Sequence, residues 1–490
     1  MNNKKAGNQL ILMVVITILT QGFLLIKNSL LASNFGVGVE IDAFNFVTNL
    51  SNFVFSFIGA GVGTVLIPFM REKKDRRSVN IFITAIYLLG IILAIAIFLF
   101  RGQIIQILGG NVGQDFVRIA SNLLIFAISV AFFNSINTLI TGILEFYNTY
   151  LKQKTTMLVL TVLGVGYLFL HRSFSITEYS AILATIAILT TVVNAFFTRN
   201  IDFKYRPNLD LKDQTFKEML QLMYPAVLST GVYQLSVLID TLIAARLPEG
   251  SISVLNYSNT IVAMFNMLIL TNLSTYFYPK LIQKDSEQER QDSLVDYVLV
   301  VSVILCFFVV AFVLVGREGI SILYQRGEFS ADDTQVVFLA SLLYLLQLPA
   351  NGIRELMYKY FYAQRNTYFP FVNSIMVSLM NFIFSIILVQ FFGVYGVIAG
   401  TVLAGYFSLA NITRGFAKKY SVMVSGRMVM TELGKIVLTS LLTVAIALIV
   451  KSLLPLMNVF VSVAFYGILT LILFLLLLKV FRSAIYKVRI

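Results

Sequence analysis

Polar side chains recur at helical spacing within one apolar stretch, residues 41–68. They follow one another at steps of three and four residues, and they are Asp42, Asn45, Asn49, Asn52 and Ser56. Such steps place all of them on one face of a helix. In hydrocarbon this face cannot point at lipid tails, because unsatisfied polar groups are costly there. It indicates either the wet wall of a substrate cavity, which we favour, or hydrogen bonds that hold helices together.

A single lysine lies within another apolar stretch, residues 10–31. Lys27 stands beside Asn28, about two helical turns after Gln21. Intramembrane charges are rare and usually serve function, so the amine is a candidate partner for a substrate phosphate. The alternative is that it snorkels to the membrane interface. Further amides for a polyhydroxylated substrate come from Asn256, Asn259, Asn266 and Asn272.

Oxygen-bearing side chains in three later stretches have the chemistry of a cation site. Asp240 is the only acid deep in its apolar run. It is a candidate for binding a coupling cation or proton or for pairing with Lys27, and the alternative is an ordinary carboxylate near a helix end. Asn381 and Ser385 share a helix face at i, i+4, and Thr401 follows on the next run. Oxygen ligands of this kind suit a hard cation.

The composition excludes most other chemistry. The chain has 490 residues, of which 58% are hydrophobic and 12% charged, with a mean hydropathy of +0.85. Soluble domains carry about twice that share of charged residues. With one cysteine, Cys306, and one histidine, His171, metal sites of the Cys/His type and His-based catalysis lack the necessary residues. We also find no Gly-rich phosphate loop and predict no catalytic residue.

The apolar runs predict an all-α membrane protein of about fourteen helices. With the N-terminus placed in the cytoplasm, most of the 37 Lys and Arg residues fall in cytoplasmic segments, as the positive-inside rule requires. Both termini are then cytoplasmic, and the net charge of +13 needs no nucleic-acid partner. The predicted helices are 9–33, 43–70, 79–100, 117–144, 155–170, 178–198, 218–245, 252–278, 294–315, 334–353, 369–390, 394–413, 436–454 and 459–479.

A weak internal repeat divides the chain. Residues 41–68 and 252–279 match in length, in Asn45 against Asn256, and in their final proline. Six predicted helices separate the copies, so the two halves have parallel orientation. Two such lobes around a central cavity are a common transporter plan. We predict an N-terminal lobe over residues 1–200, a C-terminal lobe over 201–420, and an appended helix pair in 421–490.

Three segments, 29–53, 225–260 and 322–335, carry a family resemblance. In order and spacing the chain resembles the MurJ (MviN) family of lipid flippases, within the MOP exporter superfamily. The resemblance implies fourteen helices, two pseudosymmetric six-helix lobes and alternating access. It also implies a role in peptidoglycan and cell-wall synthesis, as a functional monomer in the bacterial inner membrane. The substrate implied is an undecaprenyl-pyrophosphate-linked glycan such as lipid II, moved from the inner to the outer leaflet.

The resemblance also implies site residues, with departures. Lys27 and Asp42 match charged positions of the cavity, whereas Gln21, Phe55 and Thr260 stand where the family's lipid II transporters have arginines. The substrate is therefore lipid II or the lipid-linked unit of a capsule or another surface polysaccharide. Some relatives bind sodium, and Ser385 here replaces an expected carboxylate. The matching sodium ligands are Asp240, Asn381, Ser385, the carbonyl of Val397, and Thr401.

Rival functions remain open at this point. A cation-coupled multidrug antiporter would share the superfamily, but the MurJ-like segments disfavour it. A membrane glycosyltransferase would need paired carboxylates in an exposed loop, and Glu328, Asp332 and Asp333 fall instead in one of the family-like segments. A scaffold for other envelope enzymes would leave no signature in the sequence.

Overall fold

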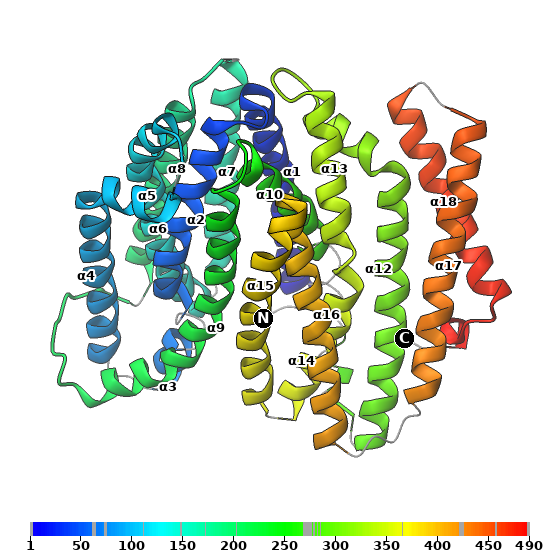
Figure 1. Ribbon diagram of the computed structural model, residues 1–490. Helices are drawn as coiled ribbons and strands as arrows, with labels where there is room; N and C mark the ends of the chain where they lie inside the picture. The colour runs from blue at the N-terminus through cyan, green and yellow to red at the C-terminus, as the bar shows by residue number, and fades with distance from the viewer. Residues whose placement is uncertain are drawn as a thin grey trace. The chain divides into compact units, whose positions relative to one another are not determined.

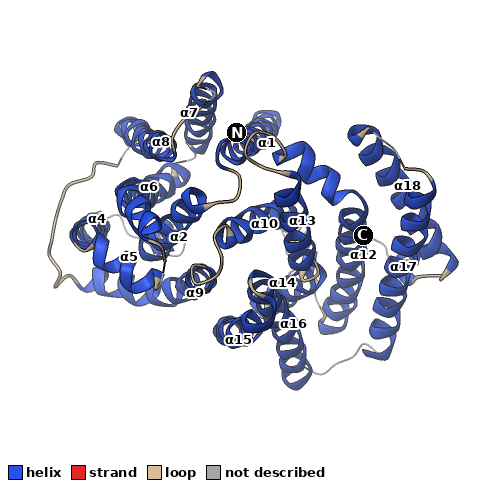
Figure 2. Cartoon of the chain, turned by 45° about the horizontal axis from the view of Figure 1, so that its top comes forward, coloured by secondary structure: helices blue, strands red, loops and turns tan. Residues whose placement is uncertain are grey.

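The computed structural model (Figure 1) is helical throughout the part of the chain that it describes. In the view of Figure 2 every drawn regular element is a helix. The described residues are 3–60, 65–72, 76–110, 112–147, 149–171, 173–201, 203–267, 277, 280–281, 283–284, 286–364, 366–420, 426–455 and 458–487.

The longer helices carry the membrane-spanning segments. In chain order the described α-helices are α1 (Asn3–Phe35), α2 (Val39–Ala60), α3 (Ile67–Glu72), α4 (Arg77–Leu99), α5 (Arg101–Gly109), α6 (Gln114–Phe146), α7 (Tyr150–Leu170), α8 (Ile176–Phe197), α9 (Gln214–Ala244), α10 (Ser251–Phe265), α12 (Glu287–Tyr324), α13 (Ala331–Leu345), α14 (Leu348–Ala363), α15 (Tyr368–Phe392), α16 (Val394–Lys419), α17 (Gly426–Leu453) and α18 (Val459–Val480).

Within these described residues, 11 helical segments are long and apolar enough to cross a membrane. They coincide with eleven of the predicted helices. The other three predictions, 43–70, 218–245 and 252–278, contain α2, α9 and α10, and two of them extend into residues outside the described part. The chain is a multi-pass membrane protein, but the count of fourteen is not confirmed.

Two local differences from the predicted helices have clear causes. The stretch predicted as one helix, 334–353, is α13 followed by α14, and a proline stands in the first turn of α14. Proline suits a helix start because it has no backbone N–H to leave unpaired. Residues 101–109, predicted as a loop, form the short helix α5, which is too short to span a membrane.

By their contacts the described helices divide into two compact units. The first unit holds residues 1–253 with 327–329, and the second holds 254–326 with 330–490. The first unit therefore continues past residue 200 and includes α9, which packs against α2. The predicted lobes 1–200, 201–420 and 421–490 stay a prediction.

The first unit is built around α2 and α6. Phe46 and Phe116 place their ring centroids 5.4 Å apart, and Phe55 and Phe132 place theirs 6.0 Å apart. Both are edge-on contacts, an arrangement that aromatic pairs favour. Around this core α6 also contacts α8, while α1 and α8 both pack along α7.

The second unit contains a close helix pair, α15 and α16. A side chain at Gly400 would place its first carbon 2.4 Å from Ser385 Oγ and 2.6 Å from Ser385 N. Only glycine fits such an approach, and small residues commonly line helix contacts in membranes. The sequence of α16 therefore brings its backbone within hydrogen-bonding reach of the polar face of α15.

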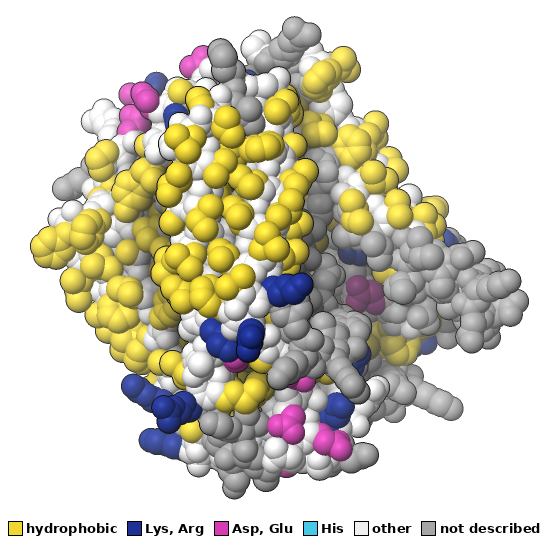
Figure 3. Space-filling view, turned by 90° about the vertical axis from the view of Figure 1, so that its right-hand side faces the viewer, with side chains coloured by type: hydrophobic (Ala, Val, Ile, Leu, Met, Phe, Trp, Pro, Cys, Tyr) yellow, Lys and Arg dark blue, Asp and Glu magenta, His cyan; other side chains and the backbone are white. Residues whose placement is uncertain are grey.

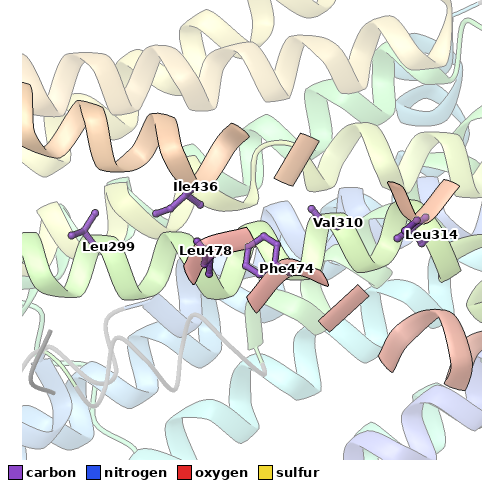
Figure 4. Packing of buried hydrophobic residues seen from close by; sticks show 7 residues of the cluster. Leu299, Val310, Leu314, Ile436, Phe474 and Leu478 are labelled. Carbon is purple, nitrogen blue, oxygen red and sulfur yellow. The ribbon is translucent and has the colours of Figure 1, made fainter. Parts of the chain in front are cut away.

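The last two helices pack on α12. Figure 4 shows the apolar cluster that joins them, which consists of Leu299, Val310, Leu314, Ile436, Ala447, Phe474 and Leu478. An ion pair adds to it, with Lys451 Nζ 2.6 Å from Glu318 Oε1. The appended helix pair is thus held both by apolar packing and by a charge pair.

The outer face of α17 and α18 is strongly apolar. Figure 3 shows hydrophobic side chains over much of this side of the molecule, with Lys and Arg gathered below them. Leu441, Ile449 and Ile468 are each about 60% exposed (63%, 59% and 61%). A continuous apolar surface of this kind is suited to lipid rather than to water.

Candidate functional site

The start of α2 is tied to the start of α10 through Asp42. Its carboxylate is 5% exposed and accepts three hydrogen bonds: from Gly250 N at 2.7 Å, Ser253 N at 2.7 Å and Ser253 Oγ at 2.5 Å. Asp42 therefore satisfies backbone donors at the beginning of α10, where a negative charge is also favourable. In the internal repeat Asp42 aligns with Ser253, so repeat-equivalent positions bond to each other.

This arrangement gives a prediction for Asp42. Asp42→Ala leaves two buried N–H groups without their acceptor, and we expect it to lower the free energy of unfolding by about 2 kcal/mol. Ser253→Ala removes only the hydroxyl bond and should cost about half as much. Thermal unfolding of both purified variants, followed by circular dichroism, measures the difference. Equal, negligible losses would contradict the tie between α2 and α10.

The rest of the polar face of α2 divides into partnered and unpartnered amides. Asn49 Nδ2 donates to Thr241 Oγ1 on α9 at 2.9 Å. Asn45 is half-buried and Asn52 is exposed, and neither side chain makes a hydrogen bond to any other described residue. Helix-to-helix bonding therefore accounts for Asn49, while Asn45 and Asn52 keep their hydrogen-bonding capacity for a ligand.

On α1, Lys27 and Asn28 are both half-buried. Within the described part of the chain, Lys27 makes no ion pair and no hydrogen bond joins either residue to the amides of α2. The nearby Gln21 is half-buried as well. The amine of Lys27 is thus a cation with no counter-charge among these residues.

The positions that depart from the resembled family have ordinary structural roles. Phe55 is 1% exposed and packs on Phe132, so it belongs to the core. Thr260 Oγ1 donates to the backbone oxygen of Asn256 within α10. Asn256 is half-buried and Asn259 is exposed, and the predicted Asn272 lies outside the described residues.

The predicted cation ligands of the second unit come together between α15 and α16. Ser385 Oγ lies 3.2 Å from Asn381 Oδ1 and 3.2 Å from the carbonyl oxygen of Val397, which Thr401 Oγ1 approaches at 3.3 Å. Asn381 and Ser385 are almost fully buried, at 3% and 0% exposed. Four neutral oxygens are thus linked in a chain of contacts between α15 and α16.

The fifth predicted ligand, Asp240, lies on α9 in the first unit and is 9% exposed. It is not placed relative to the four oxygens of the second unit. In the described residues no group of three His, Cys, Asp or Glu side chains has the geometry of a metal site. The oxygens of Asn381, Ser385, Val397 and Thr401 are ligands of the kind that suits a hard cation.

A pocket of about 680 Å³ in the first unit was not predicted. It lies where α2, the α5–α6 turn and the end of α9 meet, and its charged lining residues are Asp42, Asp115, Arg246 and Glu249. Glu249 Oε1 also accepts a hydrogen bond from Val39 N at 2.9 Å. These residues are scattered through the sequence, so no local pattern could have grouped them.

Comparison with known proteins decides the family. A family model described as "Lipid II flippase MurJ" matches residues 31–470. The chain belongs to the MurJ family. Among curated MurJ relatives, a probable lipid II flippase of Rickettsia prowazekii is 23% identical over 456 residues, covering 90% of this chain and 89% of the relative. Its counterpart in Vibrio cholerae is 21% identical over 83% of this chain and 82% of its own length.

Solved structures agree on the fold. A structure titled "Lipid II flippase MurJ, inward closed conformation" superposes with a TM-score of 0.81 at 22% identity, covering 96% of this chain and 98% of that one. An inward-facing MATE-family multidrug transporter of the MOP superfamily gives a TM-score of 0.67 at 14% identity, covering 84% and 99%. The all-α MurJ-like fold expected from the sequence is confirmed, whereas the count of fourteen helices and the two six-helix lobes stay predictions.

Proposed function

We propose that this chain is a transporter that moves a lipid-linked glycan precursor, lipid II or a close relative, from the inner to the outer leaflet by alternating access. The observation that carries the proposal is the MurJ family match, which extends from the end of α1 to α18. The unpartnered polar groups of α1 and α2 support it, because polar groups inside apolar helices need a wet or ligand-filled space.

The proposed head-group site consists of Lys27 and the amides. Lys27 faces the pyrophosphate, since its amine has no counter-charge among the described residues. The amides of Asn28, Asn45 and Asn52 donate to and accept from sugar hydroxyls, whereas the amide of Asn49 is held by Thr241. Asp42 acts on this site indirectly, because its carboxylate is already occupied by Gly250 and Ser253. The isoprenoid tail stays in lipid, so the protein carries only the polar part across.

A membrane potential would act on the charge of the empty site. Moving one elementary charge through the membrane field is worth about 2.3 kcal/mol per 100 mV. With Lys27 as the site's cation, a negative interior favours return of the unloaded site toward the cytoplasmic side. We further propose that the protein works as a monomer in the bacterial inner membrane, with both termini in the cytoplasm.

A dedicated capsule or surface-polysaccharide flippase is the second candidate. It is favoured by the small number of positive charges in the site. At the three positions where the family's lipid II transporters have arginines, Phe55 is a core residue, and Gln21 and Thr260 are neutral. Lysine also lacks the bidentate phosphate contacts that arginine makes. Such a protein would carry a lipid-linked unit other than lipid II by the same route.

Complementation separates these candidates. A bacterium depleted of its own lipid II flippase would express this chain, and growth would be followed together with lipid II exposure on the outer leaflet. Rescue is the expected result. If a well-expressed, membrane-inserted protein fails to rescue, lipid II is not its substrate, and the polysaccharide lost on deletion of its gene identifies the alternative.

We also propose sodium as the coupling ion, held in the second unit by Asn381, Ser385, the carbonyl of Val397 and Thr401. Ser385→Ala removes one ligand and should weaken sodium binding by at least the roughly tenfold that loss of a supporting group costs a metal site. Sodium-dependent thermal stabilisation of the purified protein, with choline as the inert cation, measures this. Ser374→Ala is the matched control, since that hydroxyl bonds only to the Pro370 carbonyl of its own helix. Equal responses of both variants to sodium would refute the site.

A further inference from the structure

A groove of about 470 Å³ runs between the beginning of α7 and the end of α8. The two helices lie side by side in Figures 1 and 2 and contact each other. Both contain segments able to cross a membrane, and Val159 in the groove wall is 49% exposed. The groove therefore opens to the lipid around the protein. Its lining residues are Leu151, Lys152, Thr155, Thr156, Val159, Leu160, Val193 and Phe197.

One end of this α7–α8 groove is positively charged. Lys152 Nζ lies 5.6 Å from the ring centroid of Phe197, and the guanidinium of Arg199 lies 5.2 Å from that of Phe196. In the part of the chain that is described, neither of these two cations forms an ion pair. The charge at this end is therefore available to a ligand.

The remainder of the groove offers no free polar group to a ligand, because its two threonine hydroxyls bond within α7. The hydroxyls of Thr155 and Thr156 donate to the carbonyl oxygens of Leu151 and Lys152, one turn earlier in α7. Beyond them the wall consists of valine, leucine and phenylalanine side chains. A ligand that fits must combine a negative head with a hydrocarbon chain.

We propose that the α7–α8 groove binds an anionic phospholipid of the adjacent leaflet. Its phosphate lies at Lys152, and one acyl chain lies along Val159, Leu160 and Val193. Basic pockets between membrane helices recognise lipid head groups in this way. The distribution of Lys and Arg predicts that this end is cytoplasmic. The proposal goes beyond glycan transport, because it concerns a resident lipid and none of the proposed head-group residues.

Native mass spectrometry of the purified full-length protein tests the site. Phosphatidylglycerol would be titrated against the wild type, Lys152→Gln, Val193→Trp and the control Lys479→Gln, which removes an exposed lysine from the last turn of α18. We expect Lys152→Gln to bind about fivefold more weakly, since one lysine near an anionic surface contributes a little under one decade of affinity. Val193→Trp fills the groove and should lower binding with all charges kept. Lys479→Gln should bind like the wild type.

Four results would overturn the proposal. Unchanged binding by both Lys152→Gln and Val193→Trp would show that the lipid does not bind in this groove. Equal binding of phosphatidylcholine would show that an anionic head group is not required. Displacement by inorganic phosphate alone would show that the acyl chain does not contribute to binding. Displacement by an equal amount of a polyprenyl pyrophosphate assigns the groove to the transported lipid instead of a resident one.

Discussion

Replacing Lys27 with glutamine should reduce transport by roughly a hundredfold while leaving the protein folded. A hydrogen bond to a charged partner contributes up to about 3 kcal/mol, and this energy corresponds to about two decades in affinity or rate. The fold should not suffer, because Lys27 makes no ion pair among the described residues. Outer-leaflet exposure of lipid II in the depleted strain, normalised to membrane protein level, is the measurement.

The matched control is Lys27→Arg, which keeps the cation. It should retain most of the transport activity, because arginine keeps the positive charge and can form bidentate hydrogen bonds with phosphate. Full transport by Lys27→Gln would show that the amine only snorkels to the interface, as the alternative interpretation of the sequence holds. Loss in both variants, with normal expression, would point to a steric demand at this position.

Replacing Lys451 with methionine should lower the stability of the second unit by about 2 kcal/mol, because it leaves the carboxylate of a half-buried pair, with side chains 29% and 20% exposed, without its partner. Its amine donates to Glu318 Oε1 at 2.6 Å and to the Leu314 carbonyl at 2.5 Å. The other carboxylate oxygen of Glu318 is buried and has no hydrogen-bond partner among the described atoms. Without the lysine, a carboxylate would remain between α12 and α17 with nothing to neutralise it.

The double variant Lys451→Met, Glu318→Gln should recover most of this loss, because no uncompensated charge remains. Lys359→Met is the control, since its pair with Glu355 joins neighbouring turns of one helix with side chains 28% and 38% exposed and should contribute less than about 1 kcal/mol. The single cysteine, Cys306, packs against the α12–α17–α18 cluster. Its reaction with a maleimide during heating therefore reports unfolding where the pair acts. A double variant as unstable as Lys451→Met would contradict the charge argument.

Several features of this protein followed from the sequence because they depend on short stretches of chain. Hydropathy over about twenty residues predicts spans, and eleven of the predicted helices coincide with described segments long and apolar enough to cross a membrane. The i, i+4 spacing of Asn381 and Ser385 placed both on one face of α15, where their side chains do meet. The three family-like segments predicted the fold class, and the structural match to MurJ confirmed it.

Other features were decided only by contacts between distant parts of the chain. Nothing local distinguishes Asp42 from the other members of its helical face, yet its partners lie 208 and 211 residues away and occupy its carboxylate. Asn49 likewise finds Thr241 on α9, whereas Asn45 and Asn52 keep their amides free of described partners. The sequence alone therefore could not show which polar residues of this face bond to other helices and which can bind a ligand.

The charged residues show most clearly which properties the sequence determines and which depend on tertiary contacts. The sequence determined that this is a basic, apolar, multi-pass membrane protein of the MurJ type, because residue counts and short-range periodicity are properties of the chain itself. Tertiary structure decided which intramembrane charges are neutralised: Lys451 meets Glu318 across 133 residues, while Lys27 meets no carboxylate in the described chain. Pairing depends on which helix faces pack together, and burial makes an unpaired charge costly enough to matter.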